Sequence, residues 1–149
     1  MSVANNKVFS ICVAIFHYTC YNVIGDDKKK YTGCIIEVSL RDKSIVNEFE
    51  IIEEINDDGI MWIVEIDENR LDDVLQRLQS AMVDTPIWYC DLKSDDYRYI
   101  IYNDKIFKVN HDYGEQYEEA KEYGLKRGIP ECQLPNFSWA KENNRAKIF

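Results

Sequence analysis

Residues 97–134, YRYIIYNDKIFKVNHDYGEQYEEAKEYGLKRGIPECQL, carry the strongest local structural signals in the chain. In Tyr97–Tyr102, aromatic and β-branched residues fall on both faces of an expected strand, because successive side chains alternate between its faces. Asn103 and Asp104 favour a tight turn, and Ile106–Val109 supply a return strand. The stretch therefore predicts a β-hairpin.

A helix is predicted directly after this hairpin. Asp112 can cap its N-terminus, and Glu115 three residues later gives the spacing of a capping box. The residues that recur at helical spacing are Tyr113, Tyr117, Ala120 and Gly124. Gly128 can adopt the left-handed conformation that ends a helix, and Pro130 prevents continuation.

Upstream of this region, the chain predicts further strands and a second helix. The predicted strands are Lys7–Tyr18, Tyr31–Leu40, Ile45–Ile55, Ile60–Ile66 and, after Pro86, Ile87–Leu92. The glutamates of Ile45–Ile55 also suit a helix, but the turn signal Asn56-Asp57-Asp58-Gly59 favours a hairpin. The second helix, capped by Asp67 or Asn69, is predicted from the apolar stripe Leu71, Val74, Leu75, Leu78 and Met82.

The expected element order is β-β-β-β-α-β-β-β-α. This order predicts an α+β fold: a mainly antiparallel sheet of about six or seven strands, with two amphipathic helices packed on it. At 149 residues the chain fits a single domain, predicted over residues 1–137. Residues 138–149 are predicted to form a C-terminal tail or short helix.

Composition indicates a cytoplasmic protein with reduced thiols. The five cysteines are irregularly spaced, and we identify no signal peptide. The longest apolar run near the start, Val8–Phe16, is too short to span a bilayer. We therefore expect no membrane association.

The negative charge is concentrated in one region. The chain has a net charge of −9, yet residues 42–73 contain twelve acids against only Lys43 and Arg70. The rest of the chain is therefore close to neutral. Because acidic proteins repel phosphate backbones, direct nucleic-acid binding is not expected.

Signals for catalysis or metal binding are weak. The candidate ligands Cys12, His17, Cys20 and Cys34 lack zinc-site spacing. His111 is predicted to be a surface turn residue, and no local signature supports a dyad between it and Cys20 or Cys90. We therefore predict no enzyme activity, no cofactor and no metal; a hydrolase with an unrecognised carboxylate site is the least favoured reading.

The acidic region suits a basic protein partner. The candidate partner-binding residues are Glu48, Glu50, Glu53, Glu54, Asp57 and Asp58, with Trp62 as an aromatic anchor. The simpler interpretation is that these acids only keep a small domain soluble.

Glu122–Leu134 (EYGLKRGIPECQL), together with Tyr99–Val109 (YIIYNDKIFKV), resembles the C-terminal part of small bacterial immunity proteins of polymorphic-toxin systems, including contact-dependent growth inhibition. This resemblance implies a cytoplasmic, non-catalytic protein that binds a cognate toxin domain, often a nuclease. The alternative is a small-ligand-binding or regulatory domain with a pocket lined by tyrosines such as Tyr99, Tyr113 and Tyr117.

Overall fold

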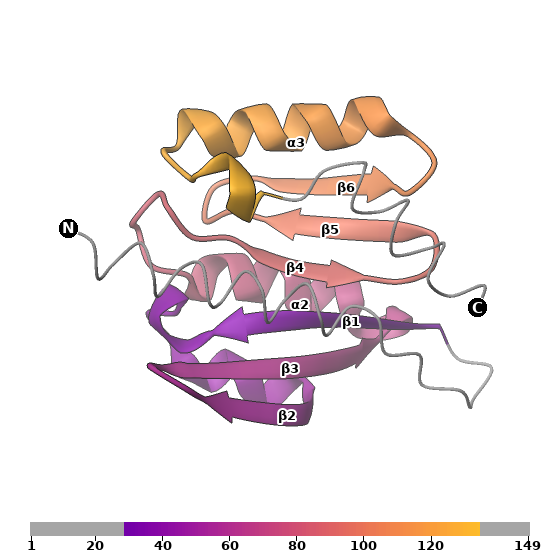
Figure 1. Cartoon of the computed structure of the whole chain (residues 1–149). Helices are drawn as coiled ribbons and strands as arrows, with labels where there is room; N and C mark the ends of the chain where they lie inside the picture. The colour runs from indigo at the N-terminus through magenta and orange to yellow at the C-terminus, as the bar shows by residue number, and fades with distance from the viewer. Residues whose placement is uncertain (1–28, 135–149) are drawn as a thin grey trace.

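The computed structural model describes residues 29–134, which form one six-stranded sheet with two helices (Figure 1). The strands are β1 (Lys30–Ile36), β2 (Glu50–Asn56), β3 (Ile60–Asp67), β4 (Cys90–Lys93), β5 (Tyr97–Ile101) and β6 (Ile106–Asn110). They lie in the order β2-β3-β1-β4-β5-β6, and every neighbouring pair is antiparallel. The helices are α2 (Glu68–Ala81) and α3 (Gly114–Lys126). The predicted α+β fold is confirmed.

The two helices pack on opposite faces of the sheet. Ile101 packs in the cluster that contains the apolar stripe of α2, whereas its neighbour Ile100 packs in the cluster that contains Tyr117 and Ala120 of α3. Because successive strand residues point to opposite faces, these clusters lie on either side of the sheet. In Figure 1, α2 lies behind the strands and α3 runs alongside β6.

The β2–β3 hairpin is confirmed, but its first strand starts later than predicted. Residues expected to open that strand form the 3₁₀ helix η2 (Lys43–Glu48), and Asp42 accepts a hydrogen bond from the Ser44 amide. Here Ile45 and Val46 are buried in the hydrophobic cluster that contains the apolar stripe of α2, which we call the α2-face cluster. The segment Lys43–Glu48 therefore packs against α2 instead of extending β2.

Two other predicted strands are too long. β1 ends at Ile36, and the 3₁₀ helix η1 (Glu37–Ser39) follows it. The Ser39 hydroxyl donates to the Ile36 carbonyl at 2.7 Å, which stabilises this turn. Ile87–Trp88 precede β4, which begins only at Cys90.

The start of α3 differs from the prediction, whereas the start of α2 agrees with it. Asp67, one of the two predicted caps, occupies the N-cap position of α2 but makes no side-chain capping hydrogen bond. The predicted Asp112 cap of α3 is wrong: Tyr113 is the N-cap and offers no side-chain hydrogen bond. Instead, Asn110 Oδ1 accepts from the Asp112 amide, and Gln116 Oε1 accepts from the Asn110 amide. Gly128 has a φ of 89°, which confirms the predicted stop.

Some predictions lie outside the described residues. These are the strand Lys7–Tyr18, the ligand candidates Cys12, His17 and Cys20, and the tail 138–149. The short 3₁₀ helix η3 (Glu131–Gln133) is the last element described.

Candidate functional site

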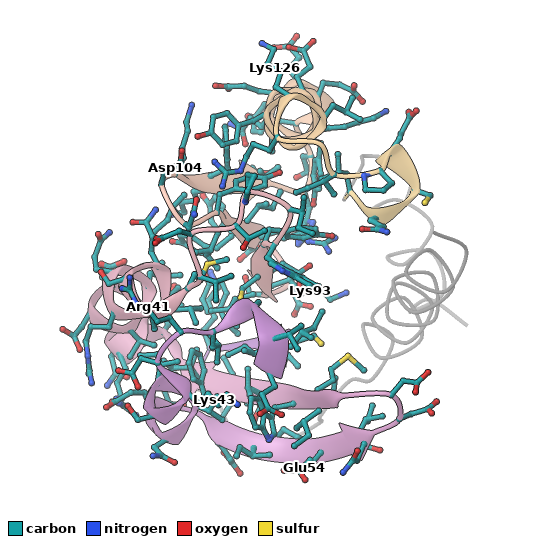
Figure 2. The ribbon with its side chains drawn as sticks, turned by 90° about the vertical axis from the view of Figure 1, so that its left-hand side faces the viewer. Arg41, Lys43, Glu54, Lys93, Asp104 and Lys126 are labelled. Carbon is teal, nitrogen blue, oxygen red and sulfur yellow. The ribbon has the colours of Figure 1, made fainter. Side chains whose placement is uncertain are left out.

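β2 forms one edge of the sheet and is the most exposed strand. Within residues 29–134, its neighbouring strand lies on one side only, and six of its seven residues are exposed. Ile51 and Ile52 are 46% and 43% exposed, so two adjacent large apolar side chains of this strand face solvent. Figure 2 shows Glu54 at the end of the molecule opposite Lys126 of α3.

Five carboxylates follow this strand and the turn after it. We call them the acidic edge: Glu50, Glu53, Glu54, Asp57 and Asp58. All five residues are exposed, and no lysine or arginine occurs between residues 50 and 58. Six of the seven predicted partner-binding residues, the acidic edge and Trp62, therefore belong to one hairpin.

A β-bulge decides which of these acids share a face of the hairpin. Glu50 pairs with Glu65, but the register shifts after Ile51, so that Glu53 pairs with Ile63 and Glu54 with Trp62. Because paired residues share a face, Glu53 lies on the face of Ile63 and Glu54 on the face of Trp62. Glu50 and Glu53 therefore share one face and Glu54 lies on the other; without the unpaired residue that the bulge adds, Glu50 would share a face with Glu54 instead.

Trp62 and Glu54 form a cross-strand hydrogen bond. The indole N–H of Trp62 donates to Glu54 Oε2 at 2.9 Å. The Trp62 ring is partly buried against the α2-face cluster. This contact satisfies the polar group of the indole and orients one carboxylate of the acidic edge.

The tip of the hairpin exposes two more carboxylates. Asp58 has a φ of 58° and Gly59 a φ of 144°. Aspartate tolerates the left-handed region better than most residues, and glycine enters it without steric cost. Local sequence thus explains why Asp57 and Asp58 lie at an exposed turn.

Glu48 has a different environment from the other candidates. Arg70 and Arg77 of α2 donate to its carboxylate, at 2.7 and 2.6 Å. Arg70 also donates to the Glu48 carbonyl at 3.0 Å. The hydrogen bond from Arg77 lowers the Glu48 pKa below its ordinary value. Glu48 therefore links η2 to α2 through its hydrogen bonds with Arg70 and Arg77.

A small polar cleft of about 200 Å³ adjoins the start of β2. It is lined by Lys30, Glu48, Glu50, Glu65, Ile66, Asp67 and Arg70. Lys30 Nζ lies 3.1 Å from Glu65 and 3.7 Å from Glu50, and its hydrogen bond to Glu65 raises the Lys30 pKa. Because four carboxylates face two cations, the cleft continues the negative charge of the acidic edge.

A larger groove of about 490 Å³ lies between η2 and α2. Its polar lining includes Arg41, Asp42, Gln76 and Arg77.

The three predicted pocket tyrosines do not come together. Tyr99 and Tyr117 belong to clusters on opposite faces of the sheet, and Tyr113 is 60% exposed.

A buried polar network on the α3 face was not predicted. Arg98 donates to Asp91, and both residues are buried. His111, expected at the surface, is only 9% exposed. Its Nε2 lies 2.9 Å from the Ser94 carbonyl, and its Nδ1 lies 2.7 Å from the Tyr117 hydroxyl. In the neutral imidazole, Nε2 carries the proton because a carbonyl only accepts, and Nδ1 accepts from the Tyr117 hydroxyl.

These contacts explain why the surface prediction for His111 is wrong. β4 and β5 pair antiparallel, which brings Asp91 near Arg98, and α3 then places Tyr117 against His111. In the sequence, Asp91 and Arg98 are charged residues within largely apolar strands, and buried charges require partners. This pattern was the sequence signal for a buried polar network.

Burial opposes nucleophilic chemistry at two of the three described cysteines. Cys34 and Cys90 are buried free thiols, whereas Cys132 is exposed. Burial raises the pKa of Cys90 to about 12, which opposes the thiolate form that a nucleophile needs. Among residues 29–134, no three His, Cys, Asp or Glu side chains are grouped as a metal site would require.

Two further results bear on function. In the part of the chain that the structure describes, no helix has the length and apolar character needed to cross a membrane. Comparisons with protein-family models, curated proteins and solved structures give no match. Functional inference therefore depends on the geometry of the acidic edge.

Proposed function

We propose that this protein is a non-enzymatic immunity protein that binds and neutralises a cognate basic toxin domain in the cytoplasm. The supporting observation is the acidic edge, with five exposed acidic residues on one edge strand and its turn and no intervening cation. Trp62 provides a partly exposed aromatic group beside Glu54. Together they place five carboxylates and one aromatic ring on a single hairpin.

Electrostatics favours a basic partner for such a surface. Complementary charge steers diffusional encounter and can raise association rates by about 10- to 1000-fold at low salt. Toxins that are nucleases need cationic surfaces to bind phosphates. A protein that covers those cations with carboxylates would block substrate binding without catalysis.

Growth rescue tests the proposal directly. Any basic toxin-like domain encoded by a neighbouring reading frame would be expressed in bacteria together with the wild-type chain or with the triple variant Glu50→Lys, Glu53→Lys, Glu54→Lys. A matched control, Glu118→Lys, Glu119→Lys, Glu122→Lys, makes the same charge change at exposed positions of α3. We expect the wild type and the control to restore growth and the acidic-edge variant to fail.

Each other outcome contradicts part of the proposal. Growth arrest with the wild-type chain would overturn the immunity function. Full rescue by the acidic-edge variant would show that neutralisation uses another surface. Circular dichroism of both triple variants confirms that a loss of rescue does not result from unfolding.

A further inference from the structure

We propose that the acidic edge binds its partner by β-strand addition, in which an extended basic segment of the partner pairs with β2 as a seventh strand. This inference rests on the proposed function and specifies how the partner is held. Strand addition supplies affinity through backbone hydrogen bonds and specificity through alternate side chains.

The first argument is the asymmetry of the two sheet edges. β2 has β3 on one side and no described strand on the other. At the opposite edge, α3 runs alongside β6 (Figure 1). A strand edge presents backbone N–H and C=O groups that can pair with another chain. The exposed Ile51 and Ile52 add apolar surface at the same place.

Charge determines which occupant suits this edge. If β2 of a second copy paired here, the glutamates of both strands would face one another, and like charges directly opposite are destabilising. Glu50, Glu53 and Glu54 therefore disfavour self-association. They favour a strand of another protein that carries lysine or arginine.

The register of the hairpin predicts the pattern of that strand. Glu50 and Glu53 lie on one face, and Ile51 lies on the other with Glu54. An added strand with basic residues at alternate positions would place them beside Glu50 and Glu53. The cleft next to Glu50 is lined by four carboxylates and by the two cations Lys30 and Arg70. β-Branched residues at the intervening positions would contact Ile51.

Hydrogen–deuterium exchange of the intact protein tests strand addition. The probe is a blocked peptide of alternating lysine and valine, about ten residues long, which matches the length of a long strand. The control peptide alternates glutamate and valine. With the lysine peptide at saturation, we expect β2 amides to exchange at least about tenfold more slowly while α3 amides are unchanged.

A charge-swapped protein provides a second measurement. The variant Glu50→Lys, Glu53→Lys, Glu54→Lys should lose protection by the lysine peptide and gain it from the glutamate peptide. If the lysine peptide fails to bind the wild type, or binds without protecting β2 amides, strand addition is overturned. Concentration-dependent β2 protection and dimerisation of the protein alone would assign the edge to a second copy and equally overturn it.

The two proposals can fail separately. Growth rescue by the wild-type chain, combined with unchanged β2 exchange in its toxin complex, would support the immunity function and reject strand addition. Protection of β2 by the peptide, without growth rescue, would support the binding mode and reject the immunity function.

Discussion

Trp62 and Glu54 face each other across the β2–β3 hairpin, where the Trp62 indole N–H donates a 2.9 Å hydrogen bond to the Glu54 carboxylate. This contact links the partly buried ring, which packs on the α2-face cluster, to the exposed acidic edge. Anchoring a carboxylate in this way reduces the side-chain entropy that it loses on binding.

Replacing Trp62 with phenylalanine should therefore weaken partner binding more than folding. The phenyl ring retains apolar contact but donates no hydrogen bond, so Glu54 becomes freer in the unbound protein. We expect a dissociation rate several-fold higher, measured by surface plasmon resonance with the toxin domain, and a small change in melting temperature. Trp88→Phe, another partly buried tryptophan in the same cluster, is the control. Equal effects of both substitutions would contradict a specific role for the Trp62–Glu54 bond.

Association with a basic partner should depend strongly on salt. Exposed charges are screened over about 10 Å at 0.1 M ionic strength. We expect the wild-type association rate to fall by about tenfold or more between low and high salt, because steering is lost. The triple lysine variant at Glu50, Glu53 and Glu54 should associate slowly with little salt dependence. A salt-independent wild-type rate in stopped-flow measurements would argue against the acidic edge.

The buried pair of Asp91 and Arg98 should matter for stability mainly when it is broken. Asp91→Ala leaves the Arg98 guanidinium buried without its carboxylate, which costs about 3–5 kcal/mol in comparable pairs. The double variant Asp91→Leu, Arg98→Met removes both charges, so its free energy of unfolding should lie closer to the wild type. Urea denaturation measures both. The prediction is wrong if the double variant is less stable than Asp91→Ala.

Glu48 should contribute to the loss of stability in acid. Its pKa is lowered from 4.5 in the folded protein, chiefly by the hydrogen bond from Arg77. A lowered folded-state pKa stabilises the protein above the unfolded value and loses that contribution as pH falls through the folded value. We therefore expect the stability difference between wild type and Glu48→Gln to shrink as pH falls below 4.5. Glu119→Gln, at an exposed α3 position, serves as the control for removing a surface carboxylate. A difference that stays constant from neutral pH to well below 4.5 would refute this role.

Gly124 should resist a substitution that normally stabilises helices. Glycine-to-alanine changes in helix interiors usually gain about 1 kcal/mol. Here a Cβ would lie 2.4 Å from Leu134 Cδ2 and 2.7 Å from the Tyr102 hydroxyl oxygen. We expect Gly124→Ala to be destabilising overall, since overpacking costs about 1–3 kcal/mol. In a Leu134→Ala background the penalty should shrink, and thermal unfolding of the four proteins measures this coupling. A stabilised Gly124→Ala protein would contradict the packing that the structure describes.

The sequence alone predicted those features that depend on residues close together in the chain. Alternation in Tyr97–Tyr102, the apolar spacing of α2 and the positive-φ stop at Gly128 each depend on neighbours within one or two turns of chain. These patterns report which face of an element is buried. They therefore identified the elements and the α+β class. The charge run likewise located the acidic edge, because Asp57, Asp58 and Gly59 mark an exposed turn by their own conformational preferences.

Only the tertiary structure decided which side chains meet. The bulge after Ile51 places Glu50 on the face of Glu53 rather than on that of Glu54, and α2 brings Arg70 and Arg77 to Glu48 from more than twenty residues away. The burial of His111 similarly requires α3 to fold back over the sheet. Such contacts are set by strand register and helix packing, which depend on the whole chain. Local periodicity carries no information about them.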